Sequence, residues 1–247
     1  LTAGWIYQYM YGNASEAMLS AEAAHALYRS LCRRIYKAIE LTTQSIPHDS
    51  EHDCTDVLPT NLGSGTLSAA SLRRRLAGDC GEPQRLFVVP QFPNAVQAAS
   101  IDLHLGCWFK IFRRTRLGSL SFGGDSSRLD HQLALSQEEV FISPGHVLIM
   151  HPGDLVLGVT TEFVLIPKDL AGVVEGKSRL GRAGLFVATA SHVAPGFRGC
   201  VVLEIVNAGQ IPIELRPNMP ICQIVLSTLD SPVSEGYSGD SQDQITP

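Results

Sequence analysis

Residues 175–184 form the densest group of polar residues and glycines in the part of the chain that is rich in apolar runs. The segment EGKSRLGRAG contains three basic side chains, one hydroxyl and three glycines. Guanidinium groups and exposed backbone N–H groups both donate to phosphate oxygens, so this segment could hold a phosphorylated ligand. A solvated turn with ordinary surface arginines is the alternative. The G-x-x-x-x-G-K-[ST] pattern of a Walker A loop is absent.

Glu204 is the second candidate for chemistry, because it interrupts the apolar run VVLEIVN at residues 201–207. Apolar residues at both the odd and the even positions of a run are typical of a strand that is buried on both faces. Burial disfavours the charged form of a carboxyl group, which prepares the group to act as an acid and a base near neutral pH. A glutamate paired with a buried arginine is the alternative interpretation.

Three further groups of residues have ordinary structural explanations. Asp102 alternates with apolar neighbours in ASIDLHLG, which favours a hydrogen bond between strands. The run HDSEHDC at residues 48–54 has metal-ligand residue types, but it falls in a segment without fixed geometry. Two arginine clusters, at 73–75 and 113–116, lack the interleaved aromatic residues of a nucleic-acid platform.

The secondary structure that must position these residues changes along the chain, as the distribution of glycine and proline indicates. Residues 1–60 contain two Gly and two Pro, whereas residues 117–247 contain fifteen Gly and nine Pro. An apolar residue every four positions after a capping box at Asn13 and Glu16 predicts a long N-terminal helix. Its apolar stripe consists of Leu19, Ala23, Leu27, Leu31, Ile35 and Ile39. A polar stretch rich in turn formers follows and is typical of a linker.

Short strands dominate the rest of the chain. Ser68 as N-cap and Gly78 as C-terminal residue predict one short helix between them. The runs that follow have the spacing of an all-β barrel or sandwich, and no helix-length pattern separates them: VFIS, VLIM, DLVLGVT, FVLIP, LFVATA, CVVLEIV and ICQIVL. We therefore predict a helical segment at 1–44, a linker at 45–65, a mainly β domain at 66–235 and a tail at 236–247.

Composition narrows the classes of function. The net charge is -5 and only four of the basic residues are Lys, so we expect no general field for nucleic acids or anionic membranes. No apolar run approaches the ~18 residues of a membrane span, and the N-terminus has no signal-peptide pattern, so we expect a cytoplasmic protein. The chain begins at Leu1 rather than Met, from which we expect a further portion or domain upstream.

The six cysteines are scattered and form no C-x-x-C pair. Their spacing indicates reduced core thiols rather than disulfides or a structural zinc site. The H-x-E and P-C-x-x-C signature of zinc-dependent nucleobase deaminases is also absent.

Taken together, these stretches resemble the dCTP deaminase family, which is related to the trimeric dUTPases. The resemblance covers about residues 66–235 and rests on EGKSxxGRxG, PGFxGxxxLExxN and PxxLxPxMxIxQ in family order, with TLSAASLRRRLAG and AASIDLHLG before them. It implies a distorted β-barrel of jelly-roll type that assembles as a homotrimer with active sites at subunit interfaces. Those interfaces would explain why charged residues make up only 17% of the chain.

The resemblance also implies catalytic roles, in a deamination that needs no zinc. Glu204 matches the glutamate that moves protons while a water attacks cytosine C4. Ser178 matches the residue that helps to hold that water, and Arg182 matches the cation beside it. Ala190 matches the position whose backbone carbonyl orients the water.

The residues expected to bind substrate lie in two stretches. Lys177, Ser178 and Arg179 match contacts to the substrate, whose triphosphate usually arrives with Mg²⁺. In the family the C-terminal tail closes over the phosphates, and here its matching residues are Tyr237, Gln242 and Gln244.

The chain departs from the family pattern at three places. Ala194 stands where the family has the aspartate that meets the deoxyribose 3′-hydroxyl. The stretch LFVATASH is one residue short and has Ala188 where a histidine is common. In the tail, Ser241 occupies the position of a tyrosine, and no Lys or Arg follows Arg216.

The resemblance therefore predicts hydrolysis of dCTP to dUTP and ammonia, with dUMP and pyrophosphate as alternative final products. Two other functions stay open. One is a catalytically degenerate module that binds a nucleotide or only assembles, and so regulates a longer protein. The other is a dUTP pyrophosphatase, which Ala194 disfavours because dUTPases use the aspartate at this position to place the hydrolytic water.

Overall fold

The computed structural model describes residues 65–78, 84–113, 115, 119–120, 122, 126–187, 192–239 and 241–247. The predicted N-terminal helix, the linker up to residue 64 with its HDSEHDC run, and Ala190 lie outside the described residues. Within the described ranges, no helix has the length and apolar character needed to cross a membrane.

The predicted short helix is confirmed as α3 (Ala69–Ala77). The Ser71 backbone N–H donates to Ser68 Oγ at 3.4 Å, and Gly78 ends the helix in the left-handed region at φ 83°. Arg75 faces inward and its Nη2 lies 2.6 Å from Asp169 Oδ2. This ion pair fastens α3 to the sheet.

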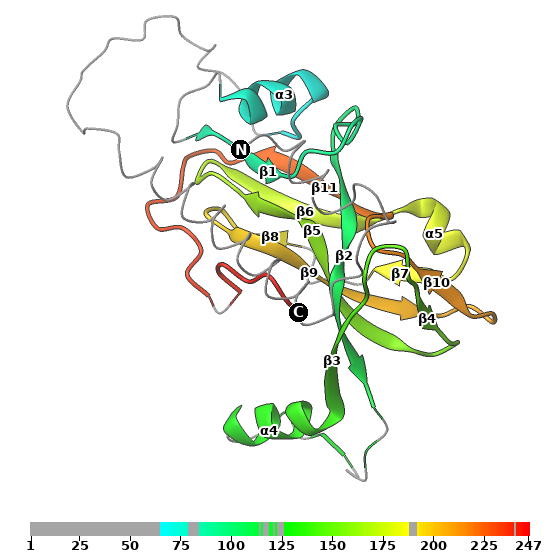
Figure 1. Ribbon diagram of the computed structural model, residues 1–247. Coiled ribbons are helices and arrows are strands. Elements are labelled where there is room, and N and C mark those ends of the chain that lie inside the picture. Colours follow the sequence, from blue (N-terminus) through cyan, green and yellow to red (C-terminus); the bar gives the residue numbers. More distant parts are fainter. Residues whose placement is uncertain are drawn as a thin grey trace, which may run out of the picture.

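One large antiparallel sheet curls into a half-barrel, and the prediction of a mainly β domain is confirmed (Figure 1). Its strand order is β7-β9-β5-β2-β11-β6-β8, while β1 pairs with β5 and β3 pairs with β2. A second sheet pairs β10 with β4. The bounds are β1 (Phe87–Val89), β2 (Ile101–Phe112), β3 (Gln137–Phe141), β4 (Leu148–Met150), β5 (Leu155–Leu165), β6 (Leu170–Gly176), β7 (Leu185–Val187), β8 (His192–Val193), β9 (Arg198–Asn207), β10 (Ile213–Leu215) and β11 (Pro220–Thr228).

The core lies on one face of the sheet and follows from the alternation of apolar residues. Leu103 and Leu105 of β2 and Leu203 and Ile205 of β9 are fully buried. Each buried aliphatic side chain contributes about 1.5–3 kcal/mol. A smaller cluster on the other side of the sheet consists of Trp108, Val159, Phe163 and Cys200.

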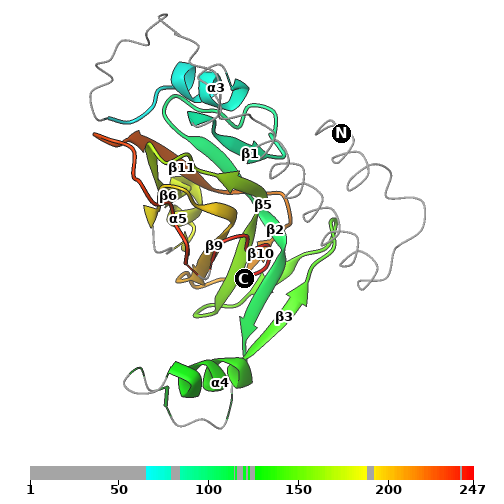
Figure 2. The same ribbon diagram turned by 90° about the vertical axis from the view of Figure 1, so that its left-hand side faces the viewer.

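Two helices and one long strand differ from the predictions. Helix α4 (Ser126–Ser136) lies at the end of the arm that β2 and β3 form, opposite α3 (Figure 2). Helix α5 (Ser178–Arg182) lies between β6 and β7, where the sequence predicted no helix. Neither helix has an apolar repeat long enough to recognise. The runs DLVLGVT and FVLIP form one strand, β5, with an irregularity between Val159 and Phe163.

Candidate functional site

Helix α5 gathers the predicted basic residues on a short exposed element. Lys177 is its N-cap, and its backbone N–H donates to the Ile221 carbonyl of β11 at 3.4 Å. The side chains of Ser178, Arg179 and Arg182 are exposed. Three basic groups and a hydroxyl within about one and a half helical turns suit a phosphorylated ligand.

Glycine fixes the end of this helix. Gly184 adopts φ 93°, and a Cβ on it would lie 2.6 Å from the Gly209 Cα. The Ala208 backbone N–H donates to the Gly184 carbonyl at 2.9 Å. This close backbone contact sets where α5 stands relative to the end of β9.

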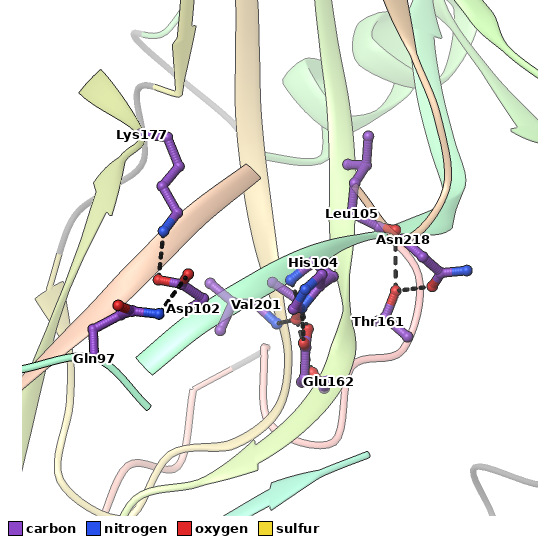
Figure 3. Close-up of polar contacts among 10 residues, drawn as sticks. Gln97, Asp102, His104, Leu105, Thr161, Glu162, Lys177, Val201 and Asn218 are labelled. Atoms are coloured by element: carbon purple, nitrogen blue, oxygen red, sulfur yellow. Dashed lines mark hydrogen bonds and ion pairs between the residues drawn. The ribbon is translucent and has the colours of Figure 1, made fainter. Parts of the chain in front are cut away.

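Lys177 does not point freely into solvent. Its ammonium donates to Asp102 Oδ1 on β2, and Asp102 Oδ2 accepts a second hydrogen bond from Gln97 at 3.3 Å (Figure 3). Asp102 was predicted to bond between strands, and it instead bonds the N-cap of α5 and a loop. The ion pair holds the Lys177 side chain in one direction.

Glu204 is exposed, so the prediction of a strand buried on both faces is wrong for the single chain. Only the face of β9 that carries Leu203 and Ile205 is buried. On the other face, Glu204 lies directly opposite Leu157, and Phe186 lies opposite Val206. Its apolar neighbours on this face, which we call the Glu204 face, are Leu155, Leu157, Phe186, Val202 and Val206.

The single chain does not bring the predicted catalytic residues together. Among the residues that the structure describes, no hydrogen bond or ion pair joins Glu204 to Ser178 or Arg182. Glu204 also forms no ion pair with an arginine in the described ranges, so the alternative of a glutamate paired with a buried arginine is not found there. Within the described part of one chain, the Glu204 carboxylate and the basic helix α5 therefore make no direct polar contact.

The predicted tail residues lie against the turn before β9. The Tyr237 backbone N–H donates to the Pro195 carbonyl at 2.8 Å, and its ring lies 5.7 Å from the Phe197 ring. Gln242 Oε1 accepts from the Arg198 backbone N–H at 3.2 Å. The Gln244 carbonyl accepts from the Cys200 backbone N–H at 2.7 Å.

A buried acid–base pair was missed in the sequence. Glu162 is 1% exposed, and its Oε1 lies 2.6 Å from His104 Nδ1 while its Oε2 accepts from the His104 backbone N–H at 2.9 Å (Figure 3). The Phe92 ring stacks on the His104 ring at 3.9 Å. Burial raises the pKa of Glu162, although the hydrogen bonds from His104 oppose this. A charged residue within the apolar run of β5 was the available signal.

The described residues offer no set of three His, Cys, Asp or Glu side chains arranged to hold a metal ion. Burial raises the pKa of the Cys107 thiol to about 12, so this thiol is unreactive near neutral pH.

Known proteins match most of the β domain. A family model described as dCTP deaminase-like matches residues 67–229. The chain is 39% identical over 154 residues to a protein named dCTP deaminase, dUMP-forming, from Mycobacterium avium, and this match covers 62% of the chain and 77% of the relative. The protein of the same name from Mycolicibacterium paratuberculosis is 38% identical over the same lengths.

A solved structure supports the fold. The 2′-deoxycytidine 5′-triphosphate deaminase from Agrobacterium tumefaciens superposes with a TM-score of 0.51 at 24% identity. The match covers 67% of this chain and 49% of that one, so the chain spans about half of the solved protein.

Proposed function

Because the chain belongs to the dCTP deaminase-like family, we propose that it hydrolyses dCTP to dUTP and ammonia. The names of the two curated relatives support a second hydrolysis of dUTP to dUMP and pyrophosphate. Each step consumes one water. The presence of the EGKSxxGRxG and PGFxGxxxLExxN motifs, with Glu204 in the second, supports deamination over a pure dUTP pyrophosphatase.

The observation that carries this proposal is the position of Glu204 on an exposed apolar face. Phe186, which lies opposite Val206 on the same face, is 53% exposed. A second copy of the chain that covers the Glu204 face would remove Leu155, Leu157 and Phe186 from water, which is favourable by about 25 cal/mol per Å². The same contact would desolvate the carboxylate and bring a neighbour's α5 to it. We propose the homotrimer of the related dUTPases as this assembly.

In the proposed reaction Glu204 moves the protons. It accepts a proton from the water as the water oxygen bonds to cytosine C4, and it delivers this proton to N3. It then takes the second proton from the new C4 hydroxyl and delivers it to the leaving amino group, so that the hydroxyl becomes the C4 carbonyl. The C4–N bond then breaks and ammonia leaves. Ser178 of one copy holds the water, Arg182 stabilises the carboxylate beside it, and the carbonyl of Ala190 orients the water.

Lys177 and Arg179 bind the triphosphate, which arrives as its Mg²⁺ complex. The ion pair with Asp102 supports this role for Lys177, because it holds the ammonium at the start of α5. An ammonium has three donors, so two remain for phosphate oxygens.

The product assay tests the proposal. The protein is incubated with Mg²⁺ and either dCTP or, in a separate reaction, dUTP, and ammonia, dUTP, dUMP and pyrophosphate are resolved over time. We expect ammonia in a one-to-one ratio to the deoxyuridine nucleotides. Binding of dCTP without turnover would instead support the degenerate module, and turnover of dUTP alone would support the pyrophosphatase.

A further inference from the structure

A cavity lies between α3 and the loop that joins β1 to β2, and α3 stands beside β1 in both views of the fold (Figures 1 and 2). Its volume of about 380 Å³ falls within the range of about 300–1,000 Å³ that is typical of small-molecule sites. In the part of the chain that the structure describes, no residue of α5 or β9 lines it. This cavity, which we call the α3 pocket, is therefore separate from the site proposed for the nucleotide.

Three polar side chains face the α3 pocket. Arg73 comes from the helix, and Gln91 and Asn94 come from the loop. All three residues are exposed, and none of their side chains forms a hydrogen bond or ion pair with another described residue. Within the described ranges, their hydrogen-bonding groups are therefore available to a ligand, which would replace water rather than a protein partner.

Apolar side chains form the rest of the wall. Leu76, Phe92 and Val96 line the pocket and also pack against the main core. Behind them lies a smaller chamber of about 30 Å³, whose lining includes Asp102 and Glu162. The pocket therefore has a cation on its exposed side and two acidic residues at its inner end.

The loop keeps its shape through its own hydrogen bonds. The Ala95 backbone N–H donates to the Phe92 carbonyl at 3.3 Å, and the Asp102 backbone N–H donates to the Ala95 carbonyl at 2.8 Å. Gln97 Nε2 donates to the Asn94 carbonyl at 2.8 Å and to Asp102 Oδ2 at 3.3 Å (Figure 3). Because these bonds exist without a ligand, binding does not have to order the loop, which lowers its entropic cost.

The charges of the lining favour one kind of anion. A guanidinium presents a planar fork that matches a carboxylate through two parallel hydrogen bonds. Arg73 is the one charged residue among the eight described residues that line the α3 pocket. A phosphate monoester carries about two negative charges near pH 7, so it would lack a second cation here. A single carboxylate on an apolar body fits both the cation and the wall.

We propose that the α3 pocket is a second ligand site, which binds a small organic molecule with one carboxylate on a short apolar body. The carboxylate pairs with Arg73, and the apolar body lies against Leu76 and Phe92. The amides of Gln91 and Asn94 donate to, or accept from, other polar groups of the ligand. This site does not depend on the proposed function, because the two sites share no lining residue.

Fluorine NMR with 4-fluorobenzoate tests the proposal, because this probe carries one carboxylate on a ring. The full chain is titrated, and Kd is obtained from the broadening of the fluorine signal. We expect saturable binding. The cationic probe 4-fluorobenzylamine should bind at least about tenfold more weakly, since it cannot accept hydrogen bonds from a guanidinium. No saturable binding of 4-fluorobenzoate, or equal binding of the two probes, would overturn the proposal.

Two matched pairs of exposed residues on α3 locate the probe. Arg73→Gln should raise the Kd of 4-fluorobenzoate about tenfold, because it removes a charge-assisted contact. Arg74→Gln removes an equal charge outside the lining and should change Kd less than about twofold. Ala77→Trp should fill the pocket and abolish binding, whereas Ala70→Trp lies outside the lining and should not. Equal effects within either pair would contradict the proposal.

A cation on α5 provides the last control. Arg179→Gln removes an exposed guanidinium from the proposed nucleotide site and should leave the Kd of 4-fluorobenzoate unchanged. Loss of probe binding in this variant would place the probe on α5 and overturn the α3 site. Binding of dCTP is measured separately on the Glu204→Gln protein, so its failure would count against the proposed function alone.

Discussion

Two glutamates interrupt apolar strands in this chain, and their surroundings are opposite. Glu162 is buried against His104 within one chain, while Glu204 is exposed among apolar side chains. The pattern of neighbouring residues predicted a carboxyl in an apolar strand at 204, but it could not tell which face another molecule would cover. The buried partner of Glu162 depends on the pairing of β2 with β5, which is distant in sequence.

Replacing Glu204 by glutamine keeps the size and hydrogen bonding of the side chain but removes its basicity. We expect kcat for dCTP to fall by at least about 10²-fold, the usual contribution of a general acid–base group. The Kd for dCTP should change less than about threefold, because the residue acts on the water rather than on the phosphates. Steady-state kinetics and calorimetry measure the two. A variant with near-normal turnover would remove Glu204 from the mechanism.

The Glu162 carboxyl predicts a specific pH dependence of stability. Its pKa is raised in the folded state, so the stability it contributes is present below its unfolded pKa of about 4.3 and is lost as pH rises through the folded value. We expect Tm to decline as pH rises above that unfolded pKa and the decline to be weaker in Glu162→Gln. Thermal scans of both proteins test this, and parallel curves would contradict it.

At the scale of helices and strands, features that depend on neighbouring residues could be predicted from the sequence. Contacts between segments that are distant in sequence could not. Ser68 and Gly78 marked both ends of α3 because capping involves only neighbouring residues. The position of Arg75 against Asp169, and of the C-terminal tail against the turn before β9, depends on segments that meet only after the sheet has formed. Helix α5 was missed because a helix of one turn has no period to detect.

Arg75 should stabilise the docking of α3. Its Nη2 bonds Asp169 and its Nη1 donates to the Gln84 carbonyl at 2.8 Å. We expect Arg75→Ala to lower the free energy of unfolding by about 2–4 kcal/mol, because it leaves a mostly buried carboxylate without its cation. Arg74→Ala, at an exposed position of the same helix, should cost under about 0.5 kcal/mol. Urea denaturation measures both, and equal costs would refute the assignment.

Gly184 should control the placement of α5. A Cβ at Gly184 would meet the Gly209 backbone, whereas at Gly145, which also has a positive φ of 90°, it would meet nothing within 4 Å. Either substitution to Ala should lower the free energy of unfolding by about 1 kcal/mol through backbone strain. Gly184→Ala should lower it by a further 1–3 kcal/mol, roughly, because of the clash. Unfolding experiments compare them, and we expect only Gly184→Ala to impair turnover. Similar effects on turnover would show that the contact with Gly209 does not position α5.

One explanation accounts for three features of the whole molecule. These are the low charge content, the exposed Glu204 face and the separation of Glu204 from α5. In the trimer that we propose, each chain would supply half of a site to one neighbour and the other half to the next. The mainly β fold was predictable because it depends on local alternation. The contact between Glu204 and α5 was not, because in our proposal it forms only between chains of the trimer.

Subunit complementation tests this central claim most directly. Glu204→Gln and Ser178→Ala chains are each expected to be inactive alone. When the two are co-expressed in equal amounts, about three quarters of trimers are mixed and each has one intact site of three, so about a quarter of wild-type activity should return. Activity that stays at the level of the separate variants, in trimers shown to be mixed, would place Glu204 and Ser178 in the same chain's site and contradict the account.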